Sequence, residues 1–213
     1  MAKQEHEKTA KLKVTLTFTE ELLGTCPGKS DLVADYIASK AGVDKVQEEL
    51  DAAADGAELS EVVDEQTQDS TTIFPKMPDG KPFIYDYQVK GFFKDACGML
   101  RRCKGMKSEK LLAYKKCIDG LVFVSPRQIL LQLPDNSSLG VCERPLRAQT
   151  PKGDRVCLAR SETAPAGTVI EFTIDIMKDA VIGCVDEWLD YGRLRGLGQW
   201  RNSGKGKFTF TSE

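Results

Sequence analysis

Apolar and polar residues alternate along three separated stretches of the chain, at residues 12–19, 168–177 and 207–210. Alternation with a period of two predicts β-strands that bury one face and leave the other to solvent. Two shorter apolar runs, at 121–124 and 129–133, are separated by Ser-Pro-Arg and predict two further short strands. The longest alternating run, TVIEFTIDIM at 168–177, is the clearest strand in the chain.

A period of three to four residues marks the expected helices. In residues 88–102 the apolar positions fall on one face, and the lysines and arginines lie off that face. A second helix is expected at 179–194. Ser108 is a typical N-cap for a helix through Ile118, and a further short helix is expected at 32–41.

The order of the main elements is strand, helix, strands, strand, helix, strand. This order predicts an α+β fold, a ferredoxin-like or RRM-like antiparallel sheet with helices on one face, formed by residues 1–213 as a single domain. Residues 144–160 hold two short runs around a Pro-Lys-Gly-Asp turn and predict a β-hairpin. Its cations make the hairpin basic: Arg144, Arg147, Lys152, Arg155 and Arg160.

Charge is unevenly spread along the chain. Residues 44–69 hold ten acidic residues and one basic one, within a stretch at 30–75 that we expect to be an acidic, loop-rich insertion. The net charge of the whole chain is −2, but the remainder holds 29 Lys and Arg against 22 Asp and Glu, a balance of +7. A basic body of this kind favours polyanionic partners.

The composition argues against several classes of protein. No apolar run approaches the length of a membrane span, and the polar N-terminus lacks the apolar centre of a signal peptide, so we expect a cytoplasmic protein with no membrane partner. The seven cysteines include no C-x-x-C pair, which disfavours a zinc site or a disulfide framework. Because His6 is the one histidine, Ser-His-Asp and Cys-His catalysis are excluded. We expect no cofactor and no metal.

Two G-x-G pairs lie near the C-terminus in RGLGQWRNSGKGKFTF, residues 195–210. Glycine allows positive φ and a close approach of the backbone to another surface, and the pairs flank Trp200 and Arg201. The pattern fits a loop that lies against a phosphate backbone or a nucleotide, or a plain glycine-rich hairpin before the last strand. Five residues between the pairs, and Gly206 at the hydroxyl position, exclude a Walker loop. Arg201 at the third glycine position excludes a Rossmann fingerprint.

Four stretches together resemble the RAMP superfamily, the CRISPR-associated RNA-binding proteins, and most closely the subunits that form the RNA-binding backbone of effector complexes. GLGQWRNSGKGKF resembles the glycine-rich loop of that family, and YQVKGFFK resembles its helix-opening Ser-x-Leu-Lys-Gly-x-x-Arg segment, with Gln88 and Val89 in place of Ser and Leu and with Lys94 in place of Arg. Residues 144–167, ending in SETAPAGT, are similar to the family's hairpin and strand entry, and LTFTEELLGT resembles its first strand.

The resemblance implies a modified RRM-like fold and binding of an RNA backbone, with self-association along RNA as a further expectation. Some family members cut RNA with an aspartate after the first strand, but no motif aligns Asp31 or Asp35, so neither is assigned a catalytic role. We expect a non-catalytic protein. The candidate RNA-binding residues are Lys90, Lys94, Arg101, Arg102, Arg147, Arg155, Gly196, Gly198, Trp200, Arg201, Gly204, Lys205, Gly206 and Lys207.

Three alternatives stay open at this point. The sequence is also similar to uncharacterised proteins of bacteriophages and prophages, which suggests a counter-defence protein that captures a nucleotide or nucleic-acid signal or inhibits a CRISPR-type complex. In that case a pocket would lie under the glycine loop, with Trp200 stacking on a base. The second alternative is a metal-independent ribonuclease that uses Asp, Lys or Tyr. The third is a protein-interaction module whose acidic insertion is the contact surface.

Overall fold

The computed structural model describes residues 10–28, 71–150 and 153–213, with the backbone alone described for 146–150, 153–157 and residue 179. Within these residues, one antiparallel sheet has the strand order β11-β1-β10-β6. Its strands are β1 (Ala10–Phe18), β6 (Val122–Ser125), β10 (Val169–Ile176) and β11 (Phe208–Ser212). Each alternating stretch of the sequence therefore forms a strand of this sheet.

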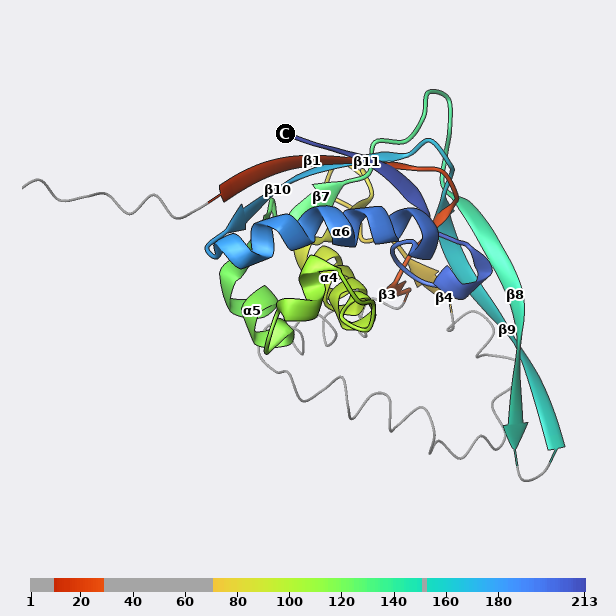
Figure 1. The fold of residues 1–213 in the computed structure, drawn as a ribbon. Helices are drawn as coiled ribbons and strands as arrows, with labels where there is room; N and C mark the ends of the chain where they lie inside the picture. Colours follow the sequence, from red (N-terminus) through yellow and green to blue (C-terminus); the bar gives the residue numbers. More distant parts are fainter. Residues whose placement is uncertain (1–9, 29–70, 151–152) are drawn as a thin grey trace, which may run out of the picture.

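Helices α4 (Asp86–Leu100) and α6 (Asp179–Arg195) lie on one face of the sheet (Figure 1). Along the chain the sheet and these helices follow the order β1-α4-β6-β10-α6-β11, and the first and third strands are neighbours in the centre of the sheet. This is the ferredoxin-like α+β arrangement, with two split β-α-β units. The fold class expected from the sequence is confirmed.

The core lies between the sheet and the two helices. Val14, Leu16 and Phe18 alternate along β1 and are buried against the helices. On α6, Trp188 is 0% exposed, and its ring lies 5.4 Å from that of Phe93 on α4. Trp188 is thus a packing residue of the core.

A second sheet carries the hairpin. In it, β9 (Gly153–Ala164) pairs with β2 (Leu22–Leu23), β4 (Thr71–Ile73) and β8 (Gly140–Thr150), and β3 (Cys26–Pro27) pairs with β4. The hairpin β8–β9 is longer than the sequence suggested, and it projects from the body of the molecule (Figure 1). The short strands β2 and β4 therefore fix the base of the hairpin to the body.

The acidic segment at 44–69, the helix expected at 32–41, and the residues His6, Asp31 and Asp35 lie outside the described residues. The end of the expected 30–75 insertion is described. The loop predicted there is wrong for three residues, because Thr71–Ile73 forms β4 between β3 and β9. The insertion thus returns to the body as part of the hairpin sheet.

The segment after α4 differs from its prediction. In place of one helix from Ser108 there are a short 3-10 helix, η1 (Lys107–Lys110), and α5 (Tyr114–Leu121), separated at Ala113 by a left-handed backbone with φ 49°. Ser108 is buried rather than a cap, because its hydroxyl donates to Glu187 and accepts from the Trp188 indole at 3.0 Å. A partner on α6, which no local pattern can show, decides the conformation here.

Two smaller features complete the fold. Strand β5 (Phe83–Tyr85), which directly precedes α4 in the chain, pairs with β7 (Gln128–Leu130). The thiols of Cys26, Cys97 and Cys184 are free and buried, while Cys103 is exposed. Among the described residues, no helix is both long enough and apolar enough to cross a membrane.

Candidate nucleic-acid interface

The glycine loop, residues 196–206, connects α6 to β11. All four of its motif glycines have positive φ, between 71° and 85°. Gly196 ends α6, and Gly204 ends a short 3-10 helix, η2 (Arg201–Ser203). The prediction that these glycines allow positive φ is confirmed.

The backbone segments that hold the two glycine pairs pack directly against each other. The amide of Leu197 donates to the Gly206 carbonyl at 2.9 Å, and the amide of Gly206 donates to the Glu21 carbonyl at 2.8 Å. A Cβ on Gly206 would collide with the Leu197 carbonyl oxygen, and one on Gly196 would lie 2.9 Å from the Gly206 carbonyl carbon. The close approach at these two positions is therefore made within the loop. At Gly204, by contrast, the nearest atoms belong to the flexible Lys207 side chain, 3.7 Å away.

Carboxylates of the body hold the cations of the loop. The Arg201 guanidinium lies 2.7 Å from Asp95 of α4, and Arg195 lies 3.3 Å from the same carboxylate. Lys205 lies 2.7 Å from Glu21, and this hydrogen bond raises the pKa of Lys205 above its ordinary value. These pairs are partly exposed and so contribute little to stability, on the order of 0–1 kcal/mol each. They orient the cations while leaving them accessible to an anionic ligand.

Three basic side chains on or just after α4 point away from the glycine loop. Lys90 donates to the carbonyl of Asp119 near the end of α5 at 3.0 Å, and burial lowers its pKa. Lys94 lies 2.6 Å from the Asp119 carboxylate, and Arg101 stacks on the Tyr114 ring at 5.1 Å. These three side chains therefore face α5. Arg102, just beyond α4, is exposed.

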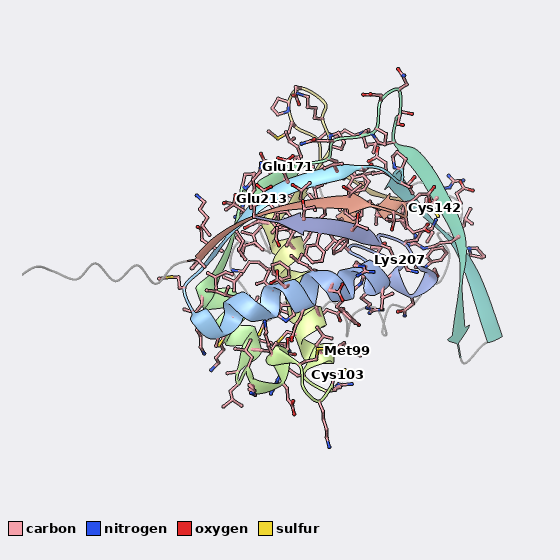
Figure 2. All side chains as sticks on the ribbon, turned by 45° about the horizontal axis from the view of Figure 1, so that its top comes forward. Met99, Cys103, Cys142, Glu171, Lys207 and Glu213 are labelled. Carbon is pink, nitrogen blue, oxygen red and sulfur yellow. The ribbon has the colours of Figure 1, made fainter. Side chains whose placement is uncertain are left out.

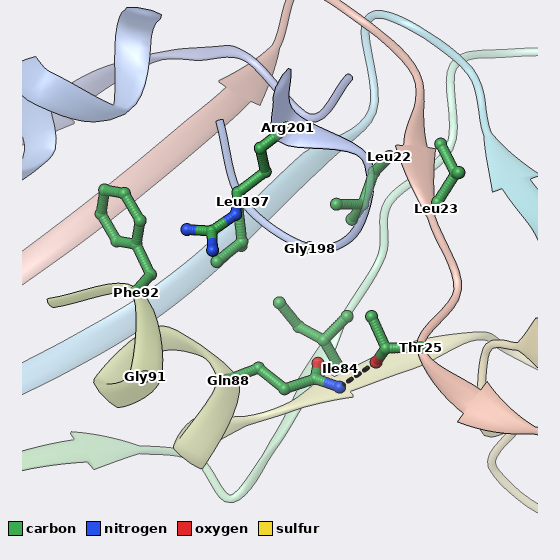
Figure 3. A pocket seen from close by; sticks show the side chains of 10 residues that line it. All are labelled: Leu22, Leu23, Thr25, Ile84, Gln88, Gly91, Phe92, Leu197, Gly198 and Arg201. Carbon is green, nitrogen blue, oxygen red and sulfur yellow. Dashed lines mark hydrogen bonds between the residues drawn. The ribbon is translucent and has the colours of Figure 1, made fainter. Parts of the chain in front are cut away.

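The opposite side of α4 faces the loop. Gln88, Gly91 and Phe92 line a cavity of about 210 Å³ together with Leu197, Gly198 and Arg201 of the loop. Figure 3 shows Gln88 reaching across to Thr25, with which it hydrogen-bonds, while Arg201 enters from the loop above. Positions 88, 91, 92 and 95 share one helical face, so this face of α4 and not the lysine face meets the loop.

The base of the hairpin also meets the loop. Arg144 of β8 lies over the Trp200 ring, with its guanidinium carbon 4.2 Å from the ring centroid. Further along the hairpin, Arg147 pairs in register with Val156 and Arg155 with Ala148. Figure 2 shows Lys207 beside the end of α6 that leads into the loop, and Cys142 on the hairpin. The loop and the hairpin thus form one continuous end of the molecule.

The sheet face away from the helices does not resemble a base-stacking platform. Its central strands present threonines and charges of both signs, and Lys13 of β1 lies 3.5 Å from Glu171 of β10. RRM domains stack bases on aromatic residues at the centre of such a sheet. Here the exposed aromatic on that face is Phe123, on the edge strand β6. The described strands of this sheet therefore place no aromatic platform of the RRM kind at its centre.

Sequence reasoning missed the partners that organise this surface. Asp95 and Glu21 were not candidates, and Arg144 was noted as one hairpin cation among five. Asp95 directly follows Lys94 at the end of the helix motif, which was the one available signal. In the described part of the chain, no three His, Cys, Asp or Glu side chains gather closely enough to hold a metal ion.

Comparison with known proteins gives a fold but no family. No family model matches the chain, and no curated protein matches it. Among solved structures, it is similar to a chain of the type III-B Cmr-beta bound to cognate target RNA, with a TM-score of 0.55, 12% identity and 97% of this chain covered. A chain of a type IV-B CRISPR complex has a TM-score of 0.48, 14% identity, and coverage of 96% of this chain and 90% of that one. This chain spans 60% of the length of the Cmr-beta chain. At this identity the likeness shows that this chain shares its fold with the chain of the type III-B Cmr-beta.

Proposed function

We propose that the protein is a non-catalytic RNA-binding protein of the RAMP type, which contacts the RNA backbone through the glycine loop and the basic hairpin. The observation that carries the proposal is the junction of these two parts, where Arg144 of the hairpin stacks on Trp200 of the loop. A single strand of RNA that lies along the hairpin would reach the loop without leaving the protein surface. The fold shared with a chain solved on target RNA supports the same reading.

In the ion pairs of the loop, an RNA phosphate can replace the carboxylate partner of each cation. A phosphodiester that approaches Arg201 competes with Asp95, and one that approaches Lys205 competes with Glu21. Because each partly exposed pair is worth only about 0–1 kcal/mol, little is lost when a phosphate replaces the carboxylate. Each replacement also releases a counterion condensed on the RNA, which favours binding at low salt.

The nucleotide-capture alternative has less support. The cavity under the loop measures about 210 Å³, and pockets that bury a small-molecule ligand are usually about 300–1,000 Å³. Trp200 stacks on Arg144 and is not among the residues that line this cavity. An extended strand on the surface fits the geometry better than an enclosed nucleotide.

A salt titration tests the proposal. Wild-type protein should bind a labelled single-stranded RNA at low salt, with a steep loss of affinity as salt rises. Arg201→Ala and Lys205→Ala should each reduce the slope of log K against log salt by about 0.7–1. Lys94→Ala is the matched control, because Lys94 is 30% exposed and ion-paired, as Arg201 is at 25%, but faces α5. The absence of binding at low salt would overturn the proposal.

The proposal extends to self-association along RNA. Sedimentation with RNA of increasing length should then show complexes that hold increasing numbers of protein copies. A single copy on long RNA, at saturating protein, would restrict the proposal to a monomer that binds RNA.

A further inference from the structure

Arg144 carries a buried charge with neutral partners. Its side chain is 7% exposed, and its guanidinium donates to the Ser161 hydroxyl at 3.2 Å and to the Gln199 side-chain carbonyl at 3.1 Å. Among the residues whose side chains the structure describes, no carboxylate forms an ion pair with it, and its Nε has no hydrogen-bond partner. Buried arginines are ordinarily paired with a carboxylate, because desolvation of an unpaired charge is costly.

The face of this guanidinium rests on Trp200. The 4.2 Å separation is well within the range of a cation–π interaction, which is stronger where the cation is desolvated. Gln199, the residue before Trp200, accepts from the same guanidinium. Arg144 therefore contacts the two loop residues directly before η2, and it contacts them from the hairpin.

The backbone conformation of Trp200 is energetically unfavourable. Its backbone lies in the left-handed region, at φ 58° and ψ 29°, which bulky residues rarely adopt. The ring lies outside the hydrophobic core clusters, and the residue is partly exposed, whereas Trp188 is fully buried in the core. Packing in the core thus does not account for the strained position. Strain of this kind is found mainly at binding and catalytic sites.

We propose that Trp200 is a stacking platform for one unpaired base, and that Arg144 is the positioning residue that fixes its ring. The inference rests on the proposed RNA-binding function and adds to it a contact with a base, beside the contacts with phosphates. The ligand class is single-stranded nucleic acid with an unstacked base, since a duplex keeps its bases stacked inside. The base would lie against the face of the indole opposite to the one that the guanidinium covers.

The decisive measurement compares two ligands on the wild-type protein. An oligoadenylate and an abasic ribose-phosphate oligomer of equal length carry the same phosphates. We expect the abasic oligomer to bind more weakly by about 5- to 150-fold, the range for one base stacked on an aromatic ring. Equal affinity would overturn the stacking proposal and leave backbone binding intact. The failure of both ligands to bind would instead overturn the proposed function.

Three variants locate the effect. Trp200→Ala should abolish the preference for the ligand with bases, and Trp200→Phe should keep most of the preference while losing the quenching of tryptophan fluorescence by oligoadenylate. Arg144→Lys keeps the charge but not the planar stack, and it should reduce the preference. In the double variant Arg144→Lys/Trp200→Ala, no further reduction is expected. If Arg144 contributes to stability alone, Arg144→Lys will lower the affinity for both ligands by the same factor. That result would overturn the assignment of Arg144 as a positioning residue. Thermal melts identify any variant that does not fold, and the wild-type comparison stands without the variants.

Discussion

The contact between the two glycine pairs can be tested by adding one methyl group at a time. Gly206→Ala places a Cβ against the Leu197 carbonyl, inside the loop. Gly204→Ala is the matched control, because its φ of 85° is as unfavourable for alanine as the 71° of Gly206, but its Cβ would meet only Lys207. The pair of variants therefore separates backbone strain from the collision.

The magnitudes follow from the contacts. Left-handed backbone costs a residue with a Cβ roughly 1–2 kcal/mol, and both variants lose this amount of unfolding free energy. In Gly206→Ala the backbone must also move, which breaks the bonds that join Gly206 to Leu197 and to Glu21. At about 0.5–1.5 kcal/mol for each bond, the total loss is roughly 2–5 kcal/mol.

Thermal unfolding is a suitable assay for this difference. For a chain of this size, 1 kcal/mol lowers Tm by about 2–4 °C, so Gly206→Ala should melt about 4–8 °C below Gly204→Ala if the two bonds together contribute about 2 kcal/mol. Equal melting temperatures would refute the reasoning, because they would show that the loop accommodates a methyl group between its two glycine pairs. RNA affinity should fall in the folded Gly204→Ala variant if Gly204 faces the ligand.

Four further predictions follow. Asp95→Asn removes the carboxylate that competes with phosphate for Arg201 and should raise RNA affinity at low salt about two- to fivefold, as measured by the same titration. Deletion of residues 44–69 should leave a folded, more basic protein that binds polyanions more tightly; loss of the folded state in circular dichroism would contradict this. Incubation with RNA, with and without magnesium or manganese, should give no cleavage; specific cleavage that is lost in Asp31→Ala or Asp35→Ala would contradict the non-catalytic proposal. Burial raises the pKa of Cys97 to about 11 from 9.0, so the unfolded state loses this proton first. The free energy of unfolding should therefore be fully retained below pH 9 and fall between pH 9 and 11, which urea unfolding across that range would detect.

The fold could be predicted from the sequence where local pattern and tertiary position agree. The alternation in residues 168–177 marks β10 because one side of that strand packs on the helices and the other does not. The spacing of apolar residues on α4 likewise gave its buried face, including Val89, Phe92 and Phe93. The positive φ of the four motif glycines followed from the glycines themselves.

The site was less predictable because its organising contacts join distant residues. Lys90 and Lys94 were candidates by motif, but Asp119, more than twenty positions later, turns them toward α5. Arg201 is held by Asp95, 106 positions earlier. The backbone of Leu197, between the two glycines of the first pair, occupies the space beside Gly206 where a side chain would begin. Such pairings depend on the tertiary fold, and no local period or spacing in the sequence encodes them.

The position of β11 at the edge of the sheet has a consequence for synthesis on the ribosome. β11 pairs with β1, and Thr209 hydrogen-bonds to Thr17 across 192 positions of sequence. The glycine loop lies just before β11, so its two ends meet only after β11 has left the ribosome. Until then β1 presents an unpaired edge, which is a site of aggregation in a nascent chain. The proposed contact surface is therefore completed late, after the other three strands of this sheet have been synthesised.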